Sequence, residues 1–320
     1  MERPHGRRIS VVGIDGSGKS TAILRLVELG SSLGGEVSVF TCPAYHRTPD
    51  APLADLSRAL DRLGIAADRL GSFELKAAAL YLQMTLYGPV EGFFRDTWSP
   101  RVLVSERNAI VDSLAYGPFY GRMVRTNLDP GPTRTAVERE LGGSEGFDPV
   151  LAWHAAECRR LGLEVSFWDL PVHVRGIFEL PWERRVEDLG RRFRSSLPDV
   201  VLFLDVPPDE AVRRIAARGG AERELHESAK MLGELRASYR AVLDALSKHA
   251  PGTECRIVDT MDPGATEAAL RDPLGRRSCG VRHPGDYVIE ASPHPGARGG
   301  NEEGPAVAGP SRSRSAGTDQ

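Results

Sequence analysis

The stretch Ile9-Ser-Val-Val-Gly-Ile-Asp-Gly-Ser-Gly-Lys-Ser-Thr21 decides the fold. Residues 13–21 match the pattern G-x-x-x-x-G-K-[ST] in full, directly after a short apolar run and directly before a helical pattern. Glycines let such a loop curl so that its backbone N–H groups point inward at phosphate oxygens, and the helix N-terminus adds a partial positive charge. The stretch therefore predicts a phosphate-binding loop between a strand and a helix, and with it a bound nucleoside triphosphate.

The last residues of this loop carry the chemistry. Lys19 is expected to reach the β- and γ-phosphates of ATP, and the Ser20 hydroxyl is expected to ligate Mg²⁺. Arginine supplies 37 of the 41 basic residues, so a lysine at this position is informative, because a compact ammonium suits it better than a planar guanidinium. The other nucleotide contacts are expected from Gly13, Asp15, Gly16, Ser17, Gly18 and Thr21.

Short apolar runs alternate with helical patterns over the first 270 residues. The expected strands are 9–12, 37–40, 102–105, 200–205 and 256–258, and the expected helices are 19–33, 50–63, 72–94, 209–218 and 226–248. Near-continuous apolar runs indicate strands that are covered on both faces. The pattern predicts a doubly wound α/β fold: a parallel five-stranded sheet with helices on both faces and ligands at the carboxyl ends of its strands.

Two segments depart from this alternation. Residues 122–197 hold three of the four tryptophans and twelve arginines, which predicts an insertion that packs as a lid, a dimer interface or an extra structural layer. Residues 271–320 contain nine glycines and six prolines but only five Leu, Ile, Val or Phe, which predicts a disordered tail or a partner-binding arm. The expected domain is therefore 1–270, with core segments 8–121 and 198–270.

Composition excludes several classes of protein. The chain of 320 residues is 41% apolar and 27% charged, with a net charge of −3, which is typical of a globular protein and not of a nucleic-acid coat or a polybasic membrane binder. No apolar run approaches the ~18–20 residues that span a bilayer. The four cysteines form no C-x-x-C pair, so neither a disulfide framework nor a zinc site is expected. Because the loop begins at Gly13, a signal peptide has no room for its apolar core, and a cytoplasmic location is expected.

Three further features of the sequence are informative: aspartate stands third in the loop, residues 102–107 end in Glu-Arg, and Ser-Leu-Ala-Tyr116 follows. They resemble the loop of thymidylate kinases and their strand that ends in Asp-Arg and precedes Ser-x-x-Ala-Tyr. Residues 203–208 and the arginines after them resemble the fourth strand and the lid, and residues 235–239 resemble the helix after the lid. The resemblance covers about residues 8–120 and 198–270. It implies a nucleotide kinase that uses ATP and Mg²⁺, and a homodimer.

The chain departs from thymidylate kinases around the acceptor. Thr41-Cys42-Pro43 replaces their Thr-Arg-Glu-Pro, and Tyr81 and Leu82 stand where their long helix carries an Asp-Arg pair. Both missing arginines would normally contact the nucleotide acceptor. Glu106 resembles the Glu-Arg-Ser motif of deoxynucleoside kinases, and Gln83 resembles their base-reading glutamine. Three functions therefore stay open: a nucleoside monophosphate kinase, a deoxynucleoside kinase, or a P-loop regulatory protein without kinase activity.

Two acidic residues and one arginine are candidates at the ends of the central strands. Glu106 can hold Mg²⁺ through water or orient the acceptor oxygen, and Arg107 offers a rigid fork to an acceptor phosphate. Asp205 ends the next strand and is expected either to serve as a second acid near Mg²⁺ or to anchor the loop that follows. Glu106 and Arg107 are thus expected catalytic residues.

The remaining candidates belong to a lid and to an acceptor site. Arg218 and Arg223 are expected to close over the triphosphate and stabilise the charge of the transition state, while Arg214 contacts the nucleotide. Arg47, just past the second strand, is expected to replace a missing acceptor arginine. The other expected acceptor contacts are Phe73, Gln83, Arg107 and Tyr116.

Overall fold

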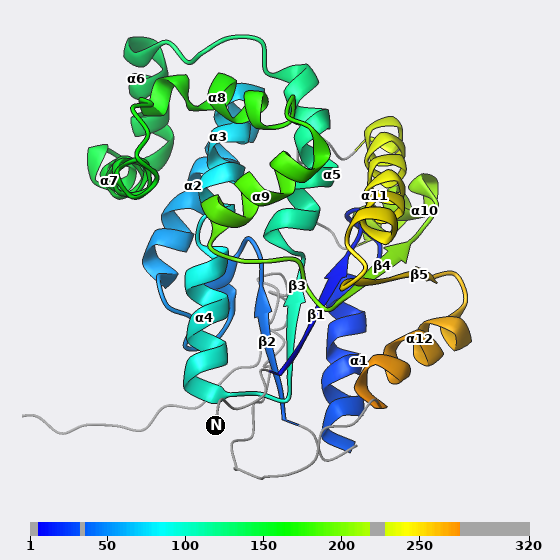
Figure 1. Ribbon diagram of the computed structural model, residues 1–320. Coiled ribbons are helices and arrows are strands. Elements are labelled where there is room, and N and C mark those ends of the chain that lie inside the picture. The colour runs from blue at the N-terminus through cyan, green and yellow to red at the C-terminus, as the bar shows by residue number, and fades with distance from the viewer. Residues whose placement is uncertain (1–5, 33–35, 218–227, 276–320) are drawn as a thin grey trace, which may run out of the picture. The chain divides into compact units, whose positions relative to one another are not determined.

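A parallel sheet of five strands forms the centre of the computed structural model, which describes residues 6–32, 36–217 and 228–275. The strands are β1 (Arg7–Val12), β2 (Val37–Thr41), β3 (Val102–Glu106), β4 (Val200–Asp205) and β5 (Glu254–Asp259), in the spatial order β2-β3-β1-β4-β5 (Figure 1). The predicted parallel five-stranded sheet is therefore confirmed. Because β1 lies between β3 and β4, the loop that follows it opens at the point where the strand order reverses, which is where α/β sheets bind ligands.

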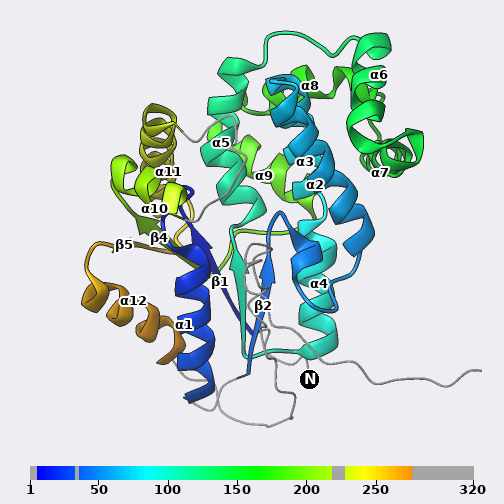
Figure 2. The ribbon, with the colours of Figure 1, turned by 180° about the vertical axis from the view of Figure 1, so that it is seen from behind.

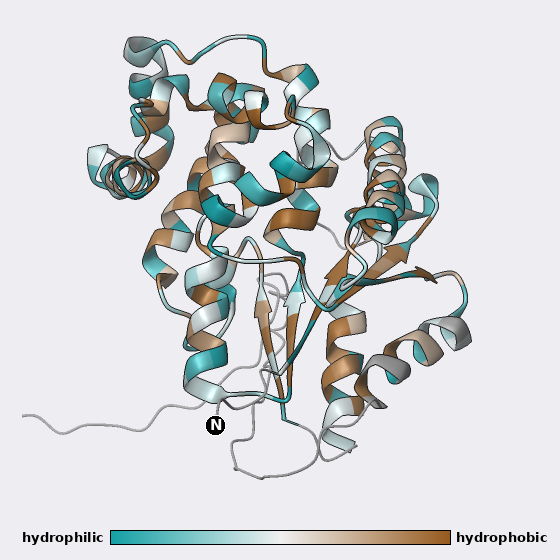
Figure 3. Cartoon of the chain, viewed as in Figure 1, coloured by the Kyte–Doolittle hydropathy of each residue, from teal (hydrophilic) through white to brown (hydrophobic). Residues whose placement is uncertain are grey.

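Two hydrophobic cores lie on opposite faces of the sheet. Ile9 and Val11 of β1 belong to one core, together with buried residues of α1 (Lys19–Ser32) and α12 (Pro263–Gly275). Figure 2 shows these two helices beside each other on that face. Val12 belongs to the larger core, which the helices of the other face complete. Figure 3 shows much of the sheet as hydrophobic, and the central strands β1, β3 and β4 are mostly buried, as expected of strands covered on both faces.

The other helices lie on the face of the sheet that carries the larger core. They are α2 (Ala54–Arg69), α3 (Phe73–Met84), α4 (Tyr87–Trp98), α5 (Ala109–Met123), α6 (Pro130–Leu141), α7 (Ser144–Leu161), α8 (Leu170–Ile177), α9 (Trp182–Phe193), α10 (Pro208–Ala217) and α11 (Ala229–His249), with 3₁₀ turns at Tyr45–Arg47 and Phe167–Asp169. No helix within the described ranges is long and apolar enough to cross a membrane.

Two helix predictions need correction. The expected helix 72–94 is two helices, α3 and α4, which meet at Thr85 and Leu86. Pro89 explains the break, since it has no N–H to donate to the carbonyl of Thr85 and its ring would collide with that carbonyl in a continuous helix. The expected helix 50–63 begins only at Ala54, after Leu53 in the left-handed conformation, and extends to Arg69.

The insertion 122–197 begins at the end of α5 and forms α6 to α9. Several polar contacts connect it to the sheet domain: Trp153 Nε1 donates to Thr85 Oγ1 at 2.7 Å, and Ser195 Oγ donates to Glu91 at 2.7 Å. The described residues all belong to one compact unit that includes the sheet. The insertion is thus a packed layer of the domain.

The C-terminal boundary lies later than the composition indicates. Helix α12 runs to Gly275, and Leu274 in its last turn is buried in the core beside α1. Residue 271, where the compositional change begins, therefore lies inside a packed helix. The rest of the expected tail, 276–320, lies outside the described residues, as do Arg218 and Arg223 of the expected lid.

Candidate functional site

The loop after β1 has the backbone that its glycines predict. Gly16 and Gly18 have φ angles of +80° and +92°, in the region that residues with a side chain rarely adopt. A Cβ on Gly16 would also strike the backbone of Ala211 in α10. Ser17 N–H donates to the Ile14 carbonyl at 3.2 Å and closes the curl. Both glycines are therefore required by the geometry of the loop.

Lys19 begins α1 and folds back over this loop. Its buried ammonium donates to the carbonyls of Gly13 and Ile14, at 3.2 and 3.0 Å, and lies 3.6 Å from the Asp15 carboxylate. Burial lowers the pKa of Lys19, and the positive charge of Arg107 lowers it further. The ammonium is held at the centre of the loop, where an anion would neutralise it.

The loop fits a phosphate group. The first N–H groups of a helix have no intrahelical partner, so the start of α1 offers free donors at this point. The buried Ser17 Oγ has no hydrogen-bond partner among the described residues, which makes it a further donor for a bound oxygen. The donor set of the loop, with the ammonium above it, is thus suited to binding phosphate oxygens.

The two expected magnesium ligands next to the loop lie together. Ser20 Oγ donates to Glu106 Oε1 at 3.2 Å, which connects the start of α1 to the end of β3. In the described part of the chain no three His, Cys, Asp or Glu residues form a cluster that could hold a metal. Mg²⁺ takes one or two carboxylates and completes its shell with water and substrate phosphates, so Ser20 and Glu106 fit it as partial ligands.

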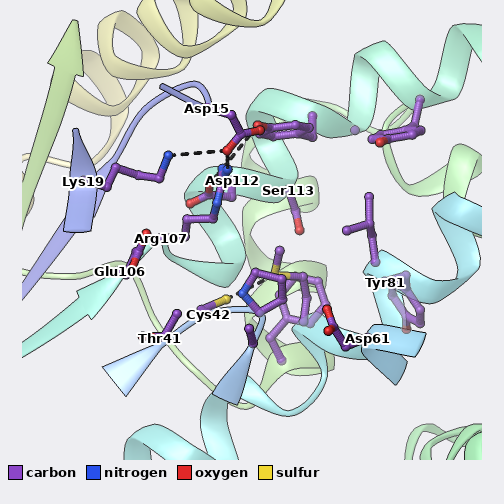
Figure 4. A pocket seen from close by; sticks show the side chains of 18 of the residues that line it. Asp15, Lys19, Thr41, Cys42, Asp61, Tyr81, Glu106, Arg107, Asp112 and Ser113 are labelled. Carbon is purple, nitrogen blue, oxygen red and sulfur yellow. Dashed lines mark hydrogen bonds and ion pairs between the residues drawn. The ribbon is translucent and has the colours of Figure 1, made fainter. Parts of the chain in front are cut away.

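Arg107 lies at the centre of a buried ionic network. It has a left-handed backbone, with φ of +66°, and its guanidinium is paired with both Asp15 and Asp112 (Figure 4). It also donates to the hydroxyls of Tyr116, at 3.2 Å, and Tyr239, at 3.3 Å. Although burial acts to lower the pKa of Arg107, the facing Tyr116 and Asp15 groups raise it well above the ordinary value. Two carboxylates therefore already compensate its charge.

Asn108 and Asp112 hold this network to the start of α5. Asn108 Oδ1 caps the helix by accepting from the N–H groups of Ile110 and Val111, at 3.0 and 3.1 Å. Asp112 accepts from the Asn108 N–H at 2.6 Å while it pairs with Arg107. Neither residue is among those expected from the sequence. A capping asparagine with a carboxylate four residues later is the local signal that marks them.

A cavity of about 270 Å³ extends from the loop into the domain. At its polar end lie the loop and the ends of β2 and β3 (Figure 4), with Asp15, Lys19, Ser20, Glu106, Arg107 and Asp112 among the lining residues. One side is a stripe of α3 formed by Ala77, Leu80, Tyr81 and Met84. The facing stripe of α5 consists of Ser113, Tyr116, Gly117 and Tyr120. The insertion completes the cavity with Val174, Phe178 and Phe193.

The expected acceptor residues divide into two groups. Arg47, Arg107 and Tyr116 line the cavity. Phe73 and Gln83 do not: Phe73 packs against the ring of Tyr120, with 6.3 Å between centroids, and Gln83 is buried without reaching the cavity. Both belong to α3, whose cavity-facing positions are 77, 80, 81 and 84. Gln83 lies on another face of α3 than this stripe, whereas Phe73 lies on the same face one turn before Ala77, where its ring contacts Tyr120 and does not line the cavity.

Asp205 and Arg214 are engaged elsewhere. The Asp205 carboxylate accepts two hydrogen bonds from Arg236, at 2.6 and 2.8 Å, and one from Arg240, at 2.5 Å. Burial acts to raise the pKa of Asp205, but these guanidinium groups hold it below its ordinary value. Arg214 donates to Glu210 at 2.7 Å and to the Thr260 carbonyl at 3.3 Å. Neither residue lines the cavity. The Asp205 carboxylate holds α11 through Arg236 and Arg240, which is neither the expected magnesium role nor the expected anchoring of the loop that follows β4.

The cavity stripes have a signal that sequence reasoning could have used. Both stripes have the spacing i, i+3, i+4, i+7, which places each set on one helix face: 77, 80, 81 and 84 on α3, and 113, 116, 117 and 120 on α5. The insertion side has no comparable signal. Val174, Phe178 and Phe193 reach the cavity only through the packing of α8 and α9.

Neither a comparison with models of known protein families nor a search of curated proteins finds a match to this chain. The function is therefore argued from the loop, the cavity and the side chains that line it.

Proposed function

We propose that this protein is a P-loop kinase that transfers the γ-phosphoryl group of ATP to a nucleoside monophosphate. One observation carries the proposal: Lys19, Ser20 and Glu106 line the same cavity whose other end is aromatic and aliphatic. Phosphoryl transfer needs a charged site for the donor and an adjacent, water-excluding site for the acceptor. A single cavity of this kind offers both, and the resemblance to thymidylate kinases supports a thymidylate-like acceptor.

The loop residues would hold the donor. The N–H groups of Gly16, Gly18 and Lys19 would bind the phosphates, and Ser20 and Glu106 would hold Mg²⁺. When bound, the magnesium–ATP complex supplies the phosphoryl group and neutralises part of its charge. The Lys19 ammonium adds positive charge beside the transferred group, which is worth most where burial excludes water.

Arg47 supports a phosphorylated acceptor. It lines the cavity, it is exposed, and its guanidinium has no hydrogen bond or ion pair among the described residues. A monophosphate brings about two negative charges, and a guanidinium binds phosphate in a bidentate manner. Arg47 therefore takes the role of one of the arginines that are absent from the thymidylate kinase pattern.

A deoxynucleoside kinase is the second candidate, and Arg107 favours it. Because Asp15 and Asp112 already compensate the charge of Arg107, the end of β3 adds little net positive charge for an acceptor phosphate. Under this alternative, Glu106 would accept the proton of the attacking hydroxyl.

The exposed Arg47 separates the two functions. If the acceptor is a monophosphate, Arg47→Ala lowers kcat/KM for thymidine monophosphate by about 10- to 150-fold, the equivalent of a charge-assisted hydrogen bond of about 1.5–3 kcal/mol. The KM for ATP stays unchanged. Arg58→Ala is the matched control, because Arg58 is an exposed arginine of α2 that pairs with Asp55 at 2.6 Å and does not line the cavity.

Two further outcomes decide against the proposal. If Arg47→Ala has no effect and thymidine is phosphorylated faster than its monophosphate, the protein is a nucleoside kinase. If ATP binds but no nucleoside and no nucleoside monophosphate is phosphorylated, the protein is a nucleotide-binding regulator. Lys19→Ala should abolish transfer in a folded protein, and residual activity above about a tenth of wild type would contradict the role of the loop.

A further inference from the structure

The end of α8 packs directly on α5 at the edge of the cavity. A Cβ built on Gly117 of α5 would overlap the ring of Phe178, so the ring lies against the helix backbone where a side chain would otherwise project. Glycine inside a helix costs about 1 kcal/mol relative to alanine, and here it makes room for an aromatic ring. Both residues line the cavity. The Phe178 ring therefore forms part of its boundary.

Backbone and side-chain contacts hold the segment that carries Phe178. Its N–H donates to the Arg175 carbonyl at 3.0 Å and continues the last turn of α8. The Arg175 guanidinium donates to the Val124 carbonyl at 3.3 Å, just past the end of α5, and the Arg175 side chain packs over Gly121. Gly117 and Gly121, one helical turn apart on α5, thus leave room for the side chains of Phe178 and Arg175, which fixes the position of Phe178.

Tyr81 and Phe193 form a second part of the cavity wall, which residues outside the cavity hold in place. Tyr81 and Phe193 are in ring contact, with 6.0 Å between centroids, and both line the cavity. The buried Arg192 donates to the Tyr81 hydroxyl at 3.0 Å and to Asp188 at 2.6 Å. Burial raises the pKa of Tyr81, which keeps its hydroxyl neutral. The insertion therefore forms a fixed wall at this end of the cavity.

We infer that Phe178 limits the size of the acceptor base that this cavity admits. The inference rests on the proposed function. The wall around Phe178 consists of aromatic and aliphatic side chains, and Gln83, which offers an amide, does not reach it. Apolar pockets discriminate by volume, by about 10- to 200-fold per methylene group, because a larger ligand collides with a wall that packing holds in place.

The test measures selectivity between a small and a large base. Phe178→Ala should raise the ratio of kcat/KM for deoxyguanosine monophosphate to that for thymidine monophosphate at least tenfold, with the KM for ATP unchanged. Thymidine and deoxyguanosine are compared in the same way. Leu180→Ala is the matched control, because Leu180 follows two residues later, is 37% exposed and does not line the cavity. Calorimetric titration of the acceptors without ATP tests the same change in preference as a ratio of dissociation constants.

The outcomes distinguish this inference from the proposed function. If Phe178→Ala transfers phosphate but its selectivity ratio stays within twofold of wild type, Phe178 does not set acceptor size, and the proposed function stands. If wild type binds neither ATP nor any of these acceptors, both are wrong. Should Phe178→Ala fail to fold, Phe178→Leu decides, since it keeps an apolar side chain while shortening the ring and should shift the ratio in the same direction.

Discussion

Replacing Asp112 by asparagine removes the charge at the centre of the buried network. The Asp112 side chain is 1% exposed, and it accepts from the Asn108 N–H, the Tyr239 hydroxyl and the Arg107 guanidinium. Asparagine has the same shape, but one of its two terminal atoms is a donor. Whichever way the amide is turned, a donor then faces a donor, and at least one charge-assisted hydrogen bond is lost.

These contacts set the size of the effect. A hydrogen bond to a charged group contributes about 1.5–3 kcal/mol, and breaking a buried ion pair costs about 3–5 kcal/mol. Arg107 keeps its second partner, Asp15, so the free energy of unfolding should fall by about 3 kcal/mol. For a domain of this size that corresponds to a melting temperature roughly 6–12 °C lower.

Urea denaturation followed by circular dichroism measures the change. Asp112→Asn should shift the midpoint and leave the slope unchanged, because the surface exposed on unfolding is the same. Glu234→Gln is the control: Glu234 pairs with Arg122 at 2.8 Å on the surface, and this exposed pair should contribute less than about 1 kcal/mol. An Asp112→Asn effect no larger than that of Glu234→Gln would refute the network as a determinant of stability.

Two further predictions concern stability. A chain that ends at Gly275 should keep its melting temperature and activity, whereas one that ends at Arg271 loses the buried Leu274 and about 1–3 kcal/mol; equal stability of the two chains would contradict the packing of α12. Burial lowers the pKa of His154, and the nearby His173 lowers it further, so the folded state holds a proton on His154 less readily than the unfolded state. Its contribution to stability is therefore present above about pH 6.5 and is lost as the pH falls through the folded-state pKa. His154→Gln should flatten the decline in melting temperature between about pH 7 and 5, and an unchanged slope would count against this origin.

Local sequence patterns were sufficient to predict the central sheet and the loop that follows β1. The central strands β1, β3 and β4 contain short apolar runs, which burial on both faces of a parallel sheet requires wherever they lie in the chain. The edge strand β5 is only partly buried and has a weaker pattern. The loop at residues 13–21 could be recognised as well, because the positive φ angles of Gly16 and Gly18 require glycine there and the whole pattern lies within a few residues. Ser20 comes after the loop that follows β1, and Glu106 is the last residue of β3. Their proximity could be predicted from sequence, because parallel strands end at one edge of the sheet.

Long-range packing determined which side chains meet at the acceptor end. Gln83 and Tyr81 stand two positions apart on α3, and only the rotation of that helix against the sheet places Tyr81 on the cavity and Gln83 away from it. From sequence, Asp205 was equally a candidate magnesium ligand and a candidate anchor of the loop that follows β4. Only the packing of α11 places Arg236 against its carboxylate. Phe178 reaches the cavity because Gly117, 61 positions earlier in the sequence, leaves room for its ring. Local propensities act over a few residues, whereas these contacts depend on how distant helices pack, and packing is a property of the whole domain.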